Sequence, residues 1–87
     1  MKIKDGFILR EVANSFVVVA VGSAVKEFNC VITLNETGAF LWKELEKGAT
    51  EEQLLQAMLN EYEVEENIAK KDIKAFIDKV SKANLLK

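Results

Sequence analysis

Apolar residues gather in short β-branched and aromatic runs in the first third of the chain and then recur at helical spacing. Two runs rich in β-branched and aromatic residues, Phe7–Val12 and Phe16–Val21, are separated by the short connector Ala13–Ser15, which has the length of a hairpin turn. A third β-branched run covers Asn29–Leu34. The pattern predicts three strands, of which the first two form an antiparallel pair.

The period changes at Asn35, a good N-cap residue, and an apolar stripe then continues at helical spacing to about Gly48. Thr50 opens a capping-box sequence, and a second stripe follows it as far as Tyr62. The third and longest amphipathic helix is predicted from about Glu66 to Ala83. The expected fold class is α+β, with the order βββααα.

Length and composition fit one domain that spans residues 1–87. The chain has a formal charge of −2 and is 49% hydrophobic and 30% charged, which argues against disorder. No apolar run approaches the roughly 18 residues that a membrane helix requires. The N-terminus has no apolar segment of the secretory type. We therefore expect a cytoplasmic protein with no membrane partner.

The composition also narrows the possible chemistry. The chain has no histidine and one cysteine, Cys30, so it cannot build a Cys/His zinc site, a Ser-His-Asp triad or an internal disulfide. No Gly-rich phosphate loop is present. We expect no metal, no cofactor and no enzymatic activity, and Cys30 is interpreted as a small apolar strand residue. A binding role remains.

Charge is divided between segments of the chain. Residues 35–66 hold nine glutamates and two lysines, whereas residues 67–87 hold six lysines and two aspartates. The two segments could be solvated faces that attract each other weakly. Alternatively, the basic third helix could contribute to a site for an acidic partner, and the sequence leaves both interpretations open.

The segment Leu34-Asn35-Glu36-Thr37-Gly38-Ala39-Phe40-Leu41-Trp42, followed by the turn Gly48–Glu52, resembles the signature of the PqqD-like family. These relatives of the pyrroloquinoline quinone synthesis protein D serve as recognition elements in ribosomal peptide modification. The resemblance extends from about Phe7 to Leu86. It implies a winged-helix-like domain, a three-stranded antiparallel sheet followed by a three-helix bundle, without catalysis of its own.

The resemblance also implies a binding mode and partners. Family members bind the leader segment of a precursor peptide as an added strand on the third strand, beside the third helix. They present it to a modifying enzyme, often a radical S-adenosylmethionine protein. The physical basis is general, because an exposed strand edge offers unpaired N–H and C=O groups to an extended peptide.

Two groups of residues are expected to form this site. In the third strand, the main chain of Val31, Ile32 and Thr33 would pair with the peptide. The side chains of Ile32 and Leu34 are expected in the core. On the third helix, Ile77 lies at the margin of the apolar stripe beside two lysines, although a core isoleucine next to solvated lysines explains it equally well. Trp42 is expected in the core. The expected peptide-binding residues are Asn29, Val31, Ile32, Thr33, Lys70, Ile73, Lys74 and Ile77.

A DNA-binding winged-helix regulator is the alternative, because the basic third helix is the recognition element of such proteins. The sequence disfavours it. The pI is about 5.2, the second helix is acidic, and the only arginine, Arg10, lies in the first strand, whereas base readout relies on arginine and asparagine. We expect no nucleic-acid partner. A hydrophobic edge could also pair with a second copy, so a monomer and a weak homodimer both remain open.

Overall fold

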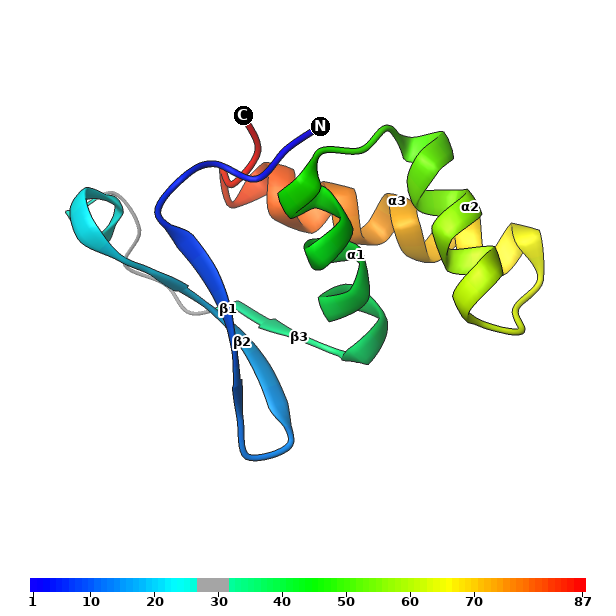
Figure 1. The fold of residues 1–87 in the computed structure, drawn as a ribbon, viewed down its shortest axis with the longest axis horizontal. Helices are drawn as coiled ribbons and strands as arrows, with labels where there is room; N and C mark the ends of the chain where they lie inside the picture. Colours follow the sequence, from blue (N-terminus) through cyan, green and yellow to red (C-terminus); the bar gives the residue numbers. More distant parts are fainter. Residues whose placement is uncertain (27–31) are drawn as a thin grey trace.

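A β-hairpin begins the fold, and helices follow it (Figure 1). The computed structural model describes residues 1–26 and 32–87. Strands β1 (Phe7–Val12) and β2 (Ser15–Ala20) pair antiparallel, with Phe7 opposite Ala20 and Val12 opposite Ser15. The hairpin prediction is confirmed, with the second strand shifted by one residue. Gly22–Lys26 then forms a short 3₁₀ helix, η1, which the sequence did not lead us to expect.

The third strand, β3 (Ile32–Leu34), pairs antiparallel with β2, and the sheet order is β1-β2-β3. Because β2 occupies the centre, β3 is an edge strand of the described sheet. The predicted third strand began at Asn29; residues 29–31, including Asn29 and Val31, lie outside the described residues. The three-stranded antiparallel sheet is confirmed.

Three helices follow the sheet: α1 (Glu36–Lys47), α2 (Glu51–Glu61) and α3 (Glu66–Lys82). The Asn35 side chain caps α1 by accepting from the Gly38 N–H at 2.7 Å. Both hydrogen bonds of the capping box at Thr50 are present, at 3.1 and 2.9 Å. The expected order βββααα and the α+β class are confirmed.

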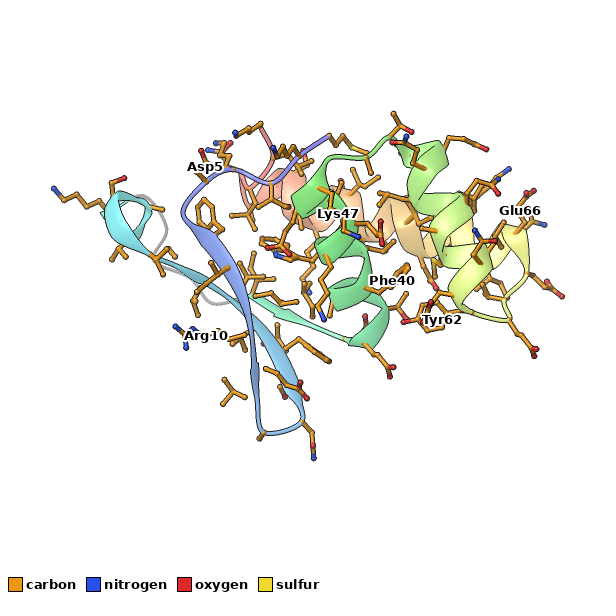
Figure 2. All side chains as sticks on the ribbon, in the orientation of Figure 1. Asp5, Arg10, Phe40, Lys47, Tyr62 and Glu66 are labelled. Atoms are coloured by element: carbon orange, nitrogen blue, oxygen red, sulfur yellow. The ribbon has the colours of Figure 1, made fainter. Side chains whose placement is uncertain are left out.

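One apolar core joins the sheet to the helices (Figure 2). Trp42 of α1 is fully buried at its centre, as the amphipathic pattern predicted. The sheet contributes Val18 and Leu34, whose side chains are at most 4% exposed. This packing holds β3 between the β2 strand and the helical layer.

The two ends of the chain lie side by side (Figure 1). Ile3 forms an isolated bridge with Leu86, and the Lys4 N–H donates to the Leu85 carbonyl at 2.8 Å. The Ile3 N–H also donates to the carbonyl of Leu45, in the last turn of α1, at 3.3 Å. Residues 1–4 therefore connect the end of α1 to the segment after α3. Within the described ranges, no helix is long and apolar enough to cross a bilayer.

Candidate functional site

The edge of β3 is the first feature of the site, and the hydrogen bonding of the hairpin fixes which of its groups face outward. The Val21 N–H donates to the Gly6 carbonyl at 2.7 Å, so Val21 directs its main-chain groups toward the first strand. Main-chain groups alternate in direction along a strand. Phe16 and Val18 of β2 therefore direct theirs toward β3.

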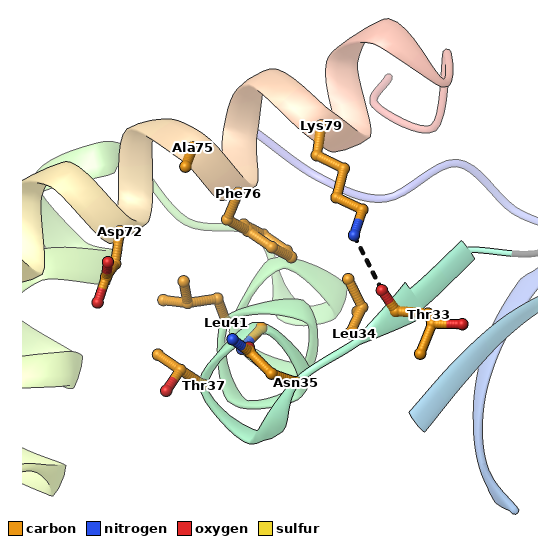
Figure 3. A pocket seen from close by; sticks show the side chains of 10 residues that line it. Thr33, Leu34, Asn35, Thr37, Leu41, Asp72, Ala75, Phe76 and Lys79 are labelled. Atoms are coloured by element: carbon orange, nitrogen blue, oxygen red, sulfur yellow. Dashed lines mark hydrogen bonds between the residues drawn. The ribbon is translucent and has the colours of Figure 1, made fainter. Parts of the chain in front are cut away.

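Their partners in β3 are Leu34 and Ile32, which flank Thr33. Thr33 must therefore point its N–H and C=O away from β2. A side-chain contact supports this orientation independently, because Lys79 Nζ of α3 donates to the Thr33 carbonyl oxygen at 2.9 Å (Figure 3). Thr33 thus offers main-chain groups to the space between β3 and α3.

A groove of about 410 Å³ occupies that space. Its floor is apolar, because the side chains of Leu34, Leu41 and Phe76 are each at most 6% exposed. Figure 3 shows the Phe76 ring directed from α3 toward Leu34 and Leu41. We call this space the β3–α3 groove; its lining residues are Thr33, Leu34, Asn35, Thr37, Gly38, Leu41, Asp72, Ala75, Phe76 and Lys79.

Opposite charges stand on the α3 side of the groove. Asp72 and Lys79 lie on either side of Phe76 in Figure 3, and both are exposed. The ion pairs found among the described residues involve neither of them. The groove therefore combines an apolar floor, outward main-chain groups and two charges without an ion-pair partner in the described part of the chain.

A glycine in α1 allows the groove its shape. A Cβ at Gly38 would lie 3.3 Å from the Leu34 Cβ and 3.1 Å from the Asn35 side-chain oxygen. Any side chain there would therefore push against a floor residue and against the cap of α1. The helix accepts the roughly 1 kcal/mol cost of an interior glycine at a position where Leu34 approaches closely.

The expected strand residues fall partly within this site. Thr33 lines the groove and faces it with its main chain. Ile32 is half-buried and pairs with Val18, so its main-chain groups are directed to β2 instead. Asn29 and Val31 lie outside the described residues.

The expected helix residues lie elsewhere on α3. Lys70, Ile73 and Lys74 line a separate hollow against the first turn of α2, and Ile73 is only 2% exposed. Lys74 and Ile77 border another hollow that includes Glu51. The structure thus places none of these four in the β3–α3 groove.

Helix geometry explains this difference. At about 100° per residue, the apolar stripe of α3 has two margins, one at Ile77 and the other at Asp72 and Lys79. The wheel cannot show which margin faces the sheet, and the apolar Ile77 was the more obvious choice. A signal for the other margin exists, because Asp72 and Lys79 are seven residues apart and share one face with Phe76.

No cluster of three or more metal-ligating side chains occurs among residues 1–26 and 32–87. The arrangement of the groove suits recognition: main-chain groups for pairing, an apolar floor for a side chain, and charges for orientation.

Comparisons with known proteins agree with this geometry. The model of the family described as coenzyme PQQ synthesis protein D (PqqD) matches residues 16–86. Among curated proteins, no sequence is significantly similar to the chain.

Two solved structures share the fold. TbiB1, solved in complex with the TbiA(beta) leader peptide, is 23% identical with a TM-score of 0.77, over 100% of this chain and 95% of that one. A lasso peptide synthetase B1, complexed with the leader peptide, is 21% identical with a TM-score of 0.73, over 97% of this chain and 93% of that one. The family match covers most of the sequence, from Phe16 in β2 to Leu86 near the C-terminus. The chain therefore belongs to the PqqD family.

Proposed function

We propose that the chain is a non-catalytic recognition module that binds the leader segment of a ribosomally made precursor peptide and presents it to a modifying enzyme. The peptide adds as a strand to the edge of β3. The outward main-chain groups of Thr33 carry this proposal, because strand addition requires an edge whose main-chain groups are not paired with another strand, beside a groove for side chains. Family membership and the leader peptides held by the two solved structures support it.

Two sets of α3 residues are candidates for contacts with the peptide. The structure favours Asp72, Phe76 and Lys79, because these line the β3–α3 groove. Contacts from Lys70, Ile73, Lys74 and Ile77 stay a prediction, as do those from Asn29 and Val31. A radical S-adenosylmethionine enzyme as the partner and a cytoplasmic location also rest on the sequence resemblance and composition.

The DNA-binding alternative gains no support from α3. Lys70 and Lys82 pair with Glu66 and Asp78 of the same helix, and Lys79 is bonded to the Thr33 carbonyl. These contacts engage three of the lysines that would have to meet phosphates.

The decisive experiment blocks the edge without altering the core. A library of random 12-residue peptides is selected on the chain, and the best binder is synthesised and titrated. Thr33→Pro removes the outward N–H, and we expect a loss of affinity of at least about tenfold, since proline cannot donate to a ladder. Thr33→Val keeps the backbone donor and changes only an exposed side chain, so its Kd should stay within about twofold.

Amide chemical shifts decide where the peptide lies. We expect perturbations at residues 32–35 and at residues 72–79. Equal affinity of Thr33→Pro and Thr33→Val, both shown to be folded by circular dichroism, would overturn strand addition. Perturbations confined to Lys70, Lys74 and Ile77, with Thr33 silent, would place the peptide in the other hollows and contradict the proposal.

A further inference from the structure

The contact between Lys79 and Thr33 is unusual because it joins a charged side chain of α3 to the main chain of a strand edge. Lys79 Nζ lies 2.9 Å from the Thr33 carbonyl oxygen, and both residues are exposed. Among the ion pairs of the described residues, none neutralises Lys79. The ammonium group is therefore held by a neutral carbonyl in place of a carboxylate.

This contact conflicts with strand addition. A strand that pairs with Thr33 must donate its own N–H to the same carbonyl oxygen. Its backbone would lie about 4.8 Å from β3, in the space on the groove side that the lysine Nζ occupies. Although a carbonyl oxygen can accept two hydrogen bonds, the added strand competes with Lys79 for the space beside this oxygen, and we expect Lys79 to leave the Thr33 carbonyl when a peptide binds.

The displaced ammonium group then needs a new partner in the groove. A carboxylate is a better acceptor than the carbonyl that Lys79 gives up, because charge-assisted hydrogen bonds are the stronger kind. The other charge of the groove, Asp72, stands seven residues earlier on α3, about 10 Å away along the helix axis. It is too far from Lys79 to serve as that partner, whereas a carboxylate on the bound peptide would lie beside the displaced ammonium group.

We propose that Lys79 is a specificity-determining residue that selects peptides with an acidic side chain on the face toward α3. Lys79 exchanges the Thr33 carbonyl for the carboxylate of the peptide, and the carbonyl becomes free to accept from the peptide backbone. This inference rests on the proposed function and names the class of peptide that the groove accepts.

The positions of Lys79 and Phe76 on α3 also predict how far apart the acidic and apolar residues of the peptide are. Side chains on one face of a strand are two residues apart, or about 6.8 Å. Lys79 is one helical turn from Phe76, whose ring forms the groove floor. The acidic residue therefore stands two positions from an apolar residue that covers Phe76 and Leu34.

The test uses the synthetic 12-residue peptide from the library selection described above. Each position in turn carries Glu, Gln or Lys, and the Kd of every version is measured. At one position, two residues from an apolar one, we expect Glu to bind about two- to fivefold more tightly than Gln, which is the range for an exposed ion pair. Lys at this position should bind more weakly than Gln.

Variants of the chain assign this preference to Lys79. In Lys79→Met, the Glu/Gln preference should fall to about onefold, and the Gln peptide should bind at least as tightly as it does to the unaltered chain because nothing has to be displaced. In Lys79→Glu, the Lys peptide should become the preferred one. Lys82→Met is the matched control, since it removes the same charge one turn later, outside the groove; the preference for Glu should persist.

Different results would contradict the role of Lys79 and the proposed strand addition. A Glu/Gln preference that persists in Lys79→Met, or that is lost equally in Lys82→Met, overturns the role of Lys79 while strand addition at Thr33 stands. Equal binding of all peptide versions to the unaltered chain also overturns it. If Thr33→Pro binds every peptide as well as Thr33→Val does, the proposed function itself is wrong.

Discussion

Trp42 fills space in the core but also buries a polar N–H group there. Its side chain is fully buried, and its indole N–H has no acceptor among the described residues. An unsatisfied buried donor costs about 1–3 kcal/mol. The ring compensates by filling the volume between the sheet and the helices, since aromatic side chains bury 150–250 Å² each in general.

This balance predicts an asymmetric pair of substitutions. Trp42→Phe removes the unsatisfied donor and keeps most of the ring, so we expect the free energy of unfolding to fall by only about 1–2 kcal/mol. Trp42→Ala leaves a large cavity and should cost about 3–5 kcal/mol. Urea denaturation followed by far-ultraviolet circular dichroism measures both, because no other tryptophan remains for fluorescence. A loss in Trp42→Phe as large as in Trp42→Ala would contradict this expected asymmetry.

Tyr62 carries the clearest electrostatic signal in the described chain. Its ring meets Phe40 edge-on, with centroids 5.5 Å apart. Burial raises the pKa of Tyr62 above its ordinary value of 10.0, and the negative charges of Glu36 and Glu61 raise it further. The neutral phenol is therefore favoured in the folded state.

Stability should consequently decline in alkali. Well below pH 10 the phenol is protonated in both the folded and the unfolded state, so Tyr62 adds no pH dependence. As the pH rises further, Tyr62 ionises first in the unfolded state. The free energy of unfolding then falls until the pH has passed the pKa of the folded state. Since Tyr62 is the only tyrosine, tyrosinate absorbance reports it alone. We expect a midpoint above 10.0 in the folded chain and a lower one in urea. In Glu36→Gln the titration midpoint of Tyr62 should drop only partly, because burial raises its pKa more than Glu36 does. A midpoint equal to that in urea would show that the charge of Glu36 is the larger cause.

At the scale of elements, local pattern was enough to predict most of the fold. The strands and helices follow from periodicity, and both the Asn35 and Thr50 caps act on residues within three positions of themselves. The contribution of α3 to the site was not predictable in this way. Whether Ile77 or Lys79 faces β3 depends on how the helix is rotated against a strand 46 residues away. The sequence shows both margins of the apolar stripe, but its periodicity does not fix this rotation.

The end of α3 shows a local signal that was predictive. Asn84, the first residue after the helix predicted from Glu66 to Ala83, adopts a left-handed φ of 61°. The N–H groups of Asn84 and Leu85 donate to the carbonyls of Ser81 and Val80, both at 3.0 Å. This is the Schellman arrangement, and its usual apolar contact is matched by the complete burial of Leu85 and Val80.

Substitutions at Asn84 should therefore separate conformation from contact. Asn84→Ala forces a Cβ-bearing residue without a local hydrogen-bonding side chain into the left-handed region, so the free energy of unfolding should fall by about 1 kcal/mol. Asn84→Gly is the control and should cause no loss, because glycine adopts this conformation freely. Chemical denaturation of the two variants decides; a loss in Asn84→Gly as large as in Asn84→Ala would point to the amide side chain instead.

At the scale of the whole molecule, the ion pairs among the described residues are mostly local. Three of the four ion pairs among the described residues join positions three or four apart on one helix, and the fourth joins Lys87 to Asp5. Exposed pairs of this kind contribute at most about 1 kcal/mol each. The acidic and basic segments are therefore mostly solvated, and the global fold depends on the apolar core and on main-chain pairing of the two ends.

That pairing involves residues whose role the sequence did not indicate, because Ile3 stands alone between charged neighbours without any periodic pattern. Its side chain is nonetheless only 5% exposed. Its main chain connects to Leu45 and Leu86, and the flanking groups of Lys2 and Lys4 bond to Lys87 and Leu85. Ile3 thus ties the C-terminal segment, and with it the end of α3, to α1.

Ile3→Ala should loosen this connection. We expect the free energy of unfolding to fall by about 2–4 kcal/mol, the usual range when a buried isoleucine is truncated, whereas Lys2→Ala, which alters an exposed side chain and keeps the backbone bonds, should change it by less than about 0.5 kcal/mol. Hydrogen exchange gives the spatial test, because the amides of Lys4 and Lys87 should exchange faster in Ile3→Ala, and those of α2 should be affected only through global unfolding. Since β3 and α3 converge on the groove, a loosened end of α3 should also weaken the Lys79–Thr33 contact.

Unchanged protection of Lys4 and Lys87, together with a loss of stability no larger than in Lys2→Ala, would show that the two ends pair without stabilising the fold.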